Sequence, residues 1–239
     1  HGRFYNGWWQ SVPSIYRGHI TIDGYKTSEV DYSSMSLRIV YALQGIQRDA
    51  DDDLYDIGLD NWTGSDDPRR KLIKVFVNAL MNDEAGNYKI KKPELRTLGL
   101  THHELLALVL KTHAPIADQL TAGVGLYSTY IDSQIAELVM KTMEADGIVV
   151  LPIHDSFLVR TGYQQWLTTV MEAAFKDVTG GIVATDADGP RLSKHFALTK
   201  EQFKEAEKEH NQDEGSGIIN GSDISFNNLF KKTIMKSYL

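Results

Sequence analysis

Two apolar runs separated by a short polar step stand out in the hydrophobic pattern of the chain. Residues 148–153 are apolar and rich in β-branched side chains, and a second apolar run, 157–159, follows His154, Asp155 and Ser156. This pattern predicts two strands joined by a tight turn, with polar residues only at the bend. Strands on both sides would hold the Asp155 carboxylate rigidly near the surface, which suits metal binding.

A second carboxylate follows an earlier strand. The Asp23-Gly24 pair lies between two alternating runs, which is a strong signal for a hairpin, and the second of its strands ends at Asp31. A serine at position 33 or 34 is suited to begin a helix that Gly45 ends. Asp31 is therefore expected at the carboxyl end of a strand, just before a helix.

The segment 67–82 has the pattern of an amphipathic helix. Asp67 and Pro68 are typical of a helix start, and apolar residues follow them at helical spacing. Cations and amides recur at every fourth position along one face: Arg70, Lys74, Asn78 and Asn82. A solvated face is the usual meaning of such a row, and a grip on a polyanion such as a triphosphate is the functional alternative.

The remaining pattern predicts further helices over 101–113, over 127–145, and from Arg160 to Gly180. The acid-rich stretch 47–67 is interpreted as a solvated connection, because its spaced aspartates lack the glycine and glutamate of a calcium loop. Residues 83–100 are expected to form polar turns. A charged helix is expected at 199–210, followed by a flexible joint and a short lysine-containing tail.

Composition narrows the function classes. The chain has 239 residues and no cysteine, which excludes disulfides, thiolate metal sites and a cysteine nucleophile. No apolar run approaches the roughly 18 residues of a membrane span and no signal peptide is present, so we expect a cytoplasmic protein with no membrane partner. The net charge of −7 argues mildly against non-specific coating of nucleic acid, but the acids concentrate in 49–67 and 201–214. Because the chain opens on His1, an upstream part is expected to be missing.

Residues 2–17 are rich in aromatic and basic side chains. Arg3 and Arg17 bracket two tryptophans and Gln10. Guanidinium groups among aromatic rings suit a surface for phosphates and bases. The alternative, which we favour for Trp8 and Trp9, is that the rings pack in a core.

Taken together, these segments resemble the palm-and-fingers core of A-family DNA polymerases and the related single-subunit phage-type RNA polymerases. Residues 31–38 (Asp-Tyr-Ser-Ser-Met-Ser-Leu-Arg) are similar to the first palm motif, and 153–157 (Ile-His-Asp-Ser-Phe) to the second in its RNA-polymerase form. Arg70 and Lys74 on one helix resemble the fingers motif, and residues 2–17 resemble the stretch before the first palm motif. The motifs follow the family's order and span 2–160.

The resemblance implies a template-directed nucleic-acid polymerase that uses two Mg²⁺ ions, with Mn²⁺ as a substitute. Asp31, Asp155 and the backbone carbonyl of Tyr32 would hold the metals. The fingers helix would bind the triphosphate, and its Lys74 would also stabilise the leaving pyrophosphate. The other residues expected to bind substrate are Arg70, Asn78 and Tyr32, with Ser36 near the sugar of the nucleotide, and those expected at primer or template are Arg3, Gln10, Arg17, Arg38 and His154.

The sequence departs from the family at several of these positions. Where the DNA polymerases carry a glutamate that blocks the ribose 2′-hydroxyl, this chain has Ser36. A small residue at this position resembles the RNA polymerases more closely. Asn78, Asn82 and Asp83 replace the aromatic and tyrosine-glycine positions of the fingers helix, so base stacking by that helix is in question. No thumb is recognisable, and an upstream segment or partner subunit is expected to supply one. The expected partners are a DNA or RNA template with its primer and nucleoside triphosphates, in a prokaryotic or viral setting.

The expected fold class is α/β (α+β), with an antiparallel palm sheet backed by helices and a small helical fingers insertion. The palm would comprise 1–46 and 126–198, the fingers-like insertion 47–125, and a helical extension 199–239. One alternative is a catalytically degenerate palm that binds nucleic acid or supports an assembly. A less favoured one is a metal phosphohydrolase that uses His154 and Asp155 with His102, His103 or His113.

Overall fold

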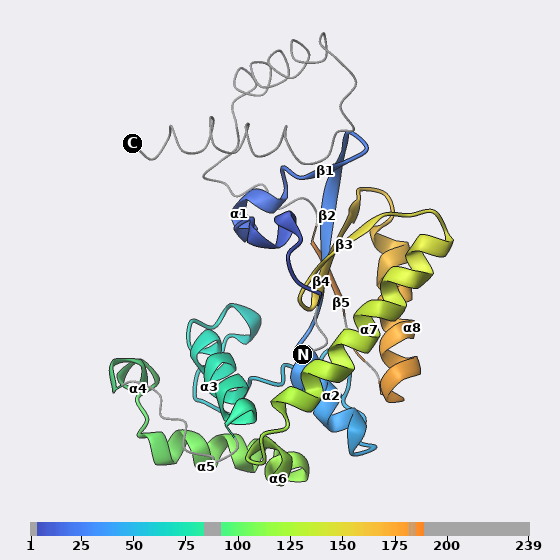
Figure 1. Ribbon diagram of the computed structural model, residues 1–239. Coiled ribbons are helices and arrows are strands. Elements are labelled where there is room, and N and C mark those ends of the chain that lie inside the picture. Colours follow the sequence, from blue (N-terminus) through green and yellow to red (C-terminus); the bar gives the residue numbers. More distant parts are fainter. Residues whose placement is uncertain (1–3, 84–91, 182, 184, 189–239) are drawn as a thin grey trace, which may run out of the picture. The chain divides into compact units, whose positions relative to one another are not determined.

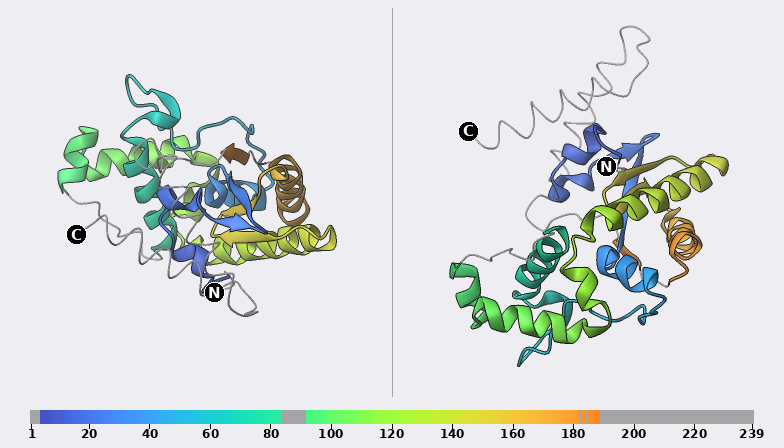
Figure 2. Two further views of the ribbon diagram at one scale, coloured as in Figure 1. Left: turned by 90° about the horizontal axis from the view of Figure 1, so that it is seen from above. Right: turned by 60° about the horizontal axis from the view of Figure 1, so that its bottom comes forward.

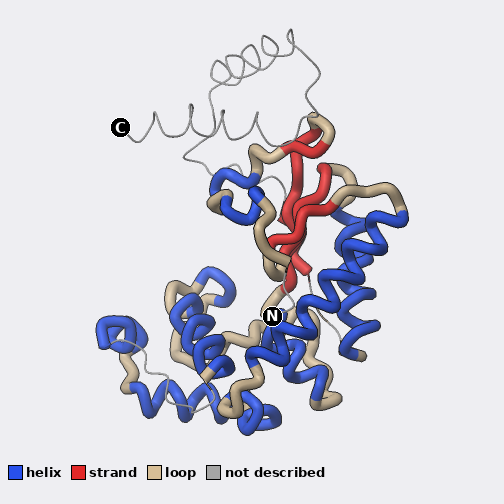
Figure 3. The backbone as a smooth tube through the Cα atoms, in the orientation of Figure 1, coloured by secondary structure: helices blue, strands red, loops and turns tan. Residues whose placement is uncertain are grey.

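An antiparallel sheet forms one part of the computed structural model, which describes residues 4–83, 92–181, 183 and 185–188 (Figure 1). Its central strand is β2 (Tyr25–Tyr32), which pairs with β1 (Thr21–Ile22), β5 (Thr185–Asp188) and β4 (Ser156–Arg160). Strand β3 (Val150–Ile153) pairs with β4 and completes the sheet in the order β1-β2-β4-β3, with β5 beside β2. The strands are drawn in red in Figure 3. The expected antiparallel sheet is confirmed.

Both predicted hairpins are present, and each has a two-residue turn. Between β1 and β2, Asp23 and Gly24 have φ values of +53° and +77°, as the type I′ turn of a tight hairpin requires. Between β3 and β4, Ile153 pairs with Ser156, which leaves His154 and Asp155 alone at the bend.

Helices cover the sheet on one face. Helix α7 (Gly125–Ala145) and helix α8 (Gln164–Thr179) run side by side against the strands, and α2 (Met35–Leu43) packs on both (Figures 1 and 2). Alternate residues of the central strands face these helices, which is the expected consequence of the two-residue period of a strand. The apolar core between the layers contains Val30, Tyr32, Phe157, Val159, Ile135, Val139, Met171 and Phe175.

A second apolar core lies among the helices that come between the two aspartates in the sequence. These helices are α3 (Arg70–Asn82), α4 (Lys92–Leu98), α5 (His102–Thr112) and α6 (Ala117–Leu120), with short 3-10 turns η2 (Gly64–Asp66) and η3 (Ala114–Ile116). The helical insertion predicted from the sequence is therefore present. Helix α2 contributes to both cores, because Ile39 packs in the first, and Leu37 and Val40 in the second.

The amino-terminal segment packs on the edge of the sheet formed by β3. It comprises η1 (Trp8–Ser11) and α1 (Ser14–Arg17). The Trp9 indole Nε1 and the Gln10 amide Nε2 both donate to the carbonyl oxygen of Pro152, at 2.9 and 3.0 Å. Both tryptophans are half-buried, so packing accounts for them at least in part.

Two predictions about loops are wrong. The stretch 47–67 is irregular, as expected, but it is not simply solvated, because Leu54, Tyr55 and Ile57 are buried in the second core. Residues 92–98 form helix α4 instead of polar turns. Ser34 does occupy the position before α2, but its side chain accepts no capping hydrogen bond and its φ is +52°. The charged helix and tail predicted at 199–239 lie outside the described residues.

Among the described residues, no helix combines the length and apolarity that a membrane span needs.

Candidate active site

The register of strands β2 and β4 brings the two aspartates together. Asp31 pairs with Ser156, and the Tyr32 N–H donates to the Asp155 carbonyl oxygen at 3.1 Å. This hydrogen bond makes Asp31 and Ser156 a non-hydrogen-bonded pair, in which the Cα atoms lie only about 4.5 Å apart. Asp155 is the next residue along, in the turn before β4, so the two aspartates occupy adjacent backbone positions of the paired segments.

Glu29 lies two residues before Asp31 on β2 and therefore on the same face of the sheet. Glu29 Oε1 accepts from Arg17 Nη1 at 2.8 Å and from Ser156 Oγ at 2.6 Å. Arg17 Nε also donates to the Val12 carbonyl oxygen at 3.1 Å. These contacts connect the amino-terminal segment to both strands beside Asp31. Arg17 is thus used inside the protein, and its contact with nucleic acid stays a prediction.

The turn that carries Asp155 has an unusual backbone. His154 has φ of +56°, a left-handed value that disfavours side chains with a Cβ. Its side chain is exposed and lies edge-on to the Tyr5 ring, with centroids 6.5 Å apart. The turn therefore presents the imidazole to solvent and directs the chain sharply into β4.

The cations of helix α3 converge on a residue that the sequence interpretation missed. The Arg70 guanidinium lies over the Tyr55 ring, with Cζ 4.9 Å from the centroid, and Lys74 Nζ lies 6.0 Å from the same centroid. Cations are attracted to the faces of aromatic rings, so Tyr55 is a shared platform for the two side chains. The Arg70 guanidinium also binds the Asp53 carboxylate, with Nε 3.0 Å from each carboxylate oxygen.

Tyr55 also connects this helix electrostatically with the aspartates. Burial raises the pKa of the Tyr55 hydroxyl to about 12; the Arg70 cation opposes this rise, and the Asp155 and Asp53 carboxylates add to it. The negative charge of Asp155 therefore acts on the same ring that supports Arg70 and Lys74. Asp155 and the helix cations therefore both act on the Tyr55 side chain.

The Arg38 side chain is buried and binds backbone carbonyl groups of the protein. Its side chain is 1% exposed, and its guanidinium donates to the carbonyl oxygens of Ser33, Asp49, Ala50 and Asp52 at 2.6–3.2 Å. Burial lowers the pKa of Arg38, and the Asp52 carboxylate opposes this effect. Arg38 holds the beginning of the 47–67 stretch against α2, and its expected contact with the substrate stays a prediction.

Three other residues predicted for the site, Tyr32, Ser36 and Gln10, make hydrogen bonds within the protein. The Tyr32 side chain is buried in the first core and donates from its hydroxyl to the Met171 carbonyl oxygen at 2.6 Å, so only its backbone remains for the role of a metal ligand. Ser36 is half-buried in the first turn of α2, and its carbonyl oxygen accepts from Ser128 Oγ at 3.4 Å. Gln10 is bound to Pro152, as described above. Arg3 lies outside the described residues.

The asparagines on α3 contact one another and the start of α7. The Asn82 side-chain amide donates to the Asn78 carbonyl oxygen at 2.7 Å. A Cβ built on Gly125 would lie 2.3 Å from Asn82 Oδ1, so the Asn82 side chain lies directly against the glycine that begins α7. These contacts account structurally for Asn82 at a position where the resembled family has an aromatic residue.

The histidines do not assemble around His154. His113 is buried, with Nδ1 2.8 Å from the Tyr41 hydroxyl, and the His102 ring lies edge-on to Phe76, with centroids 5.6 Å apart. Within the part of the chain that the structure describes, no three side chains of His, Asp or Glu gather as a metal-binding group. A metal at Asp31 and Asp155 would therefore need further ligands from backbone, water or substrate.

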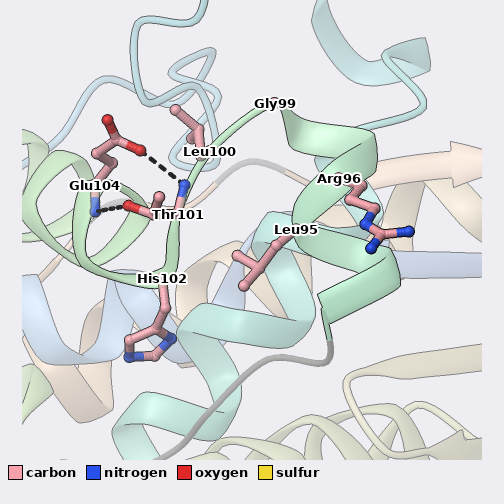
Figure 4. A pocket seen from close by; sticks show the side chains of 7 residues that line it. All are labelled: Leu95, Arg96, Gly99, Leu100, Thr101, His102 and Glu104. Atoms are coloured by element: carbon pink, nitrogen blue, oxygen red, sulfur yellow. Dashed lines mark hydrogen bonds between the residues drawn. The ribbon is translucent and has the colours of Figure 1, made fainter.

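A hollow of about 580 Å³ lies at the junction of α4 and α5 (Figure 4). Its polar groups serve the start of α5. The Thr101 N–H donates to Glu104 Oε2 at 2.7 Å, and the Glu104 N–H donates to Thr101 Oγ1 at 3.2 Å, which together form a capping box. His102, named above for the phosphohydrolase alternative, lines this hollow, whereas none of the residues predicted for the polymerase site does.

Two signals in the sequence could have identified the missed residues. The apolar residues Leu54, Tyr55 and Ile57 stand inside an acidic stretch, which is unusual for a solvated connection. Glu29 and Asp31 are two residues apart on a strand, so a two-residue period places them on one face. The pairing of Asp53 with Arg70 joins residues 17 positions apart and leaves no periodic signal.

Comparison with known proteins gives limited information. No family model and no curated protein matches the chain. Among solved structures, the chain is similar to the POL domain of Pol1 from M. smegmatis in complex with DNA primer-template and dNTP. The identity is 13% and the TM-score 0.47, over 74% of this chain and 43% of the other. The chain thus spans less than half of that structure, and a likeness at this level assigns no family.

Proposed function

We propose that this protein is a template-directed nucleotidyltransferase whose reaction depends on Asp31 and Asp155. The observation that supports this most directly is the strand register, which places Asp31 and Asp155 at adjacent backbone positions of paired segments. Two adjacent carboxylates beside a pair of cations are the groups that phosphoryl transfer from a triphosphate requires.

The donor set fits divalent cations such as Mg²⁺ or Mn²⁺. Carboxylate and carbonyl oxygens are the ligands that hard cations prefer, and Asp31, Asp155 and the Tyr32 carbonyl would hold them. When bound, such ions neutralise charge on the attacking hydroxyl and on the leaving pyrophosphate. Strand β2 and the two-residue turn between β3 and β4 fix the backbone positions of the two aspartates.

Arg70 and Lys74 serve as the triphosphate-binding groups. A guanidinium binds phosphate oxygens through two parallel hydrogen bonds, and an ammonium adds a mobile point charge. Lys74 also donates a proton or a hydrogen bond to the leaving pyrophosphate. The Tyr55 ring supports both cations, and the Asp155 carboxylate acts electrostatically on the hydroxyl of the same residue.

An extension assay tests this function. The protein is incubated with Mg²⁺, a primed template and either deoxyribonucleotides or ribonucleotides, beside Asp31→Asn and Asp155→Asn variants and an Asp23→Asn control. We expect extension by the wild type and the control, and a loss of at least about 100-fold in each aspartate variant, because each removes a ligand that neutralises the transferring phosphoryl group.

The small side chain of Ser36 leads to a sharper expectation in the same assay. Ser36→Glu should suppress extension with ribonucleotides more than with deoxyribonucleotides. Absence of extension with either nucleotide set contradicts the proposed function. Template binding without extension would instead favour a degenerate palm that acts as a nucleic-acid-binding module, for which the asparagines at 78 and 82 are the supporting residues.

A further inference from the structure

The guanidinium of Arg70 is already occupied by an anion of the protein itself. Nε lies 3.0 Å from both oxygens of Asp53, and Nη2 lies 3.0 Å from Oδ1. Asp53 is held in place for this contact, because its Oδ1 also accepts from the Tyr55 N–H at 3.1 Å. The carboxylate, the guanidinium and the Tyr55 ring therefore form one unit.

A carboxylate and a phosphate use an arginine in the same way. Both present two oxygens to the planar guanidinium, and Asp53 occupies its Nε–Nη2 edge. A phosphate that binds this same edge must displace the carboxylate.

We propose that Asp53 is an internal competitor of the triphosphate: it binds Arg70 while the site is empty and is displaced when a nucleotide enters. This inference rests on the proposed function, since it assigns Arg70 to phosphate binding. The two side chains of the ion pair are each 22% exposed. Ion pairs with this access to water are weak and exchange readily, so a multivalent anion can displace the carboxylate.

The position of Lys74 favours the exchange. Its ammonium lies over the same ring, 6.0 Å from the centroid. A triphosphate can contact both cations, whereas the single Asp53 carboxylate is bound to Arg70. After exchange, the Tyr55 ring still supports the guanidinium, so Arg70 keeps its place while its anionic partner changes.

The other role open to Asp53 is to position Arg70, and it predicts a change of opposite sign. If Asp53 only holds the guanidinium in place, removal of the carboxylate frees the side chain and weakens phosphate binding. If Asp53 competes, its removal strengthens phosphate binding. The direction of the change therefore distinguishes the two roles.

The test is calorimetric titration of the full chain with inorganic triphosphate, without template or metal. We expect Asp53→Asn to bind about fivefold more tightly than wild type, in line with the loss of a weak competing ion pair. Asp53→Ser, which keeps an acceptor for the Tyr55 N–H, should show the same gain. Asp51→Asn removes an equal charge from an exposed position of the same stretch and should change the affinity less than twofold.

Addition of Arg70→Gln to Asp53→Asn should abolish the gain in affinity, because the guanidinium that Asp53 otherwise occupies is then absent. Unchanged or weaker triphosphate binding in both Asp53 variants overturns the proposal, as does a gain that persists without Arg70. Failure of the proposed function gives a different pattern: no nucleotide extension by the wild type, while the tightening through Arg70 is still observed.

Discussion

His154 is a single residue whose backbone conformation the surrounding sheet imposes. Its φ of +56° occurs at the first position of a two-residue turn between two paired strands. The mirror-image turns of tight hairpins need such values, and glycine or asparagine usually supplies them. A histidine in this conformation stores strain directly beside Asp155, as is common for residues at functional sites.

Substitution of His154 should reveal this strain. We expect His154→Gly to be more stable than His154→Val by about 1–2 kcal/mol, because valine is strongly disfavoured at positive φ and glycine is not. Urea unfolding of the two variants measures the difference directly. Equal stabilities would mean that the turn does not hold this conformation in solution.

At the scale of elements, His113 joins the end of α5 to α2. Its Nδ1 lies 2.8 Å from the Tyr41 hydroxyl, and both side chains are buried. Burial lowers the pKa of the His113 imidazole to about 4, and the nearby Arg48 cation acts in the same direction. The imidazole is therefore neutral in the folded protein at pH 7.

This lowered pKa makes the stability of the protein depend on pH. The unfolded chain binds a proton at His113 below about pH 6.5, whereas the folded chain does so only near pH 4, so stability is lost as the pH falls between these values. We expect the free energy of unfolding to fall by about 2 kcal/mol between pH 7 and pH 5 from this group. The decrease should be smaller by this amount in His113→Asn, measured by urea unfolding at each pH. An equal decrease in both proteins would contradict the prediction.

The same scale shows where sequence interpretation succeeds. The Asp23-Gly24 hairpin, the strand pair around Asp155 and the helices α3, α5, α7 and α8 were all predictable, because each has its own local period and end signals. The 47–67 stretch was not, because Tyr55 is buried by tertiary contacts with α2 and α3 and has no periodic neighbours. The ion pair of Asp53 with Arg70 depends on the same tertiary contacts.

For the whole molecule, the candidate site depends on segments far apart in the sequence. Asp31 and Asp155 are neighbours because β2 and β4 pair, and no local pattern specifies that pairing or its register. Arg70 and Lys74 reach the same neighbourhood through Tyr55, from a helix between the two strands in the sequence. Asp31, Asp155, Arg70 and Lys74 were named from the resemblance, and their roles stay predictions, while Glu29, Asp53 and Tyr55 required the structure.

The most direct test of this account is whether Asp31 and Asp155 bind metal jointly. Titration with Mn²⁺ measures this without any assumption about the reaction, because bound Mn²⁺ no longer contributes to the electron paramagnetic resonance signal of the free ion. The account predicts that Asp31→Asn and Asp155→Asn each weaken Mn²⁺ binding at least about tenfold, while Asp23→Asn, at the other hairpin turn, binds like the wild type. Wild-type Mn²⁺ affinity in either Asp31→Asn or Asp155→Asn would contradict it.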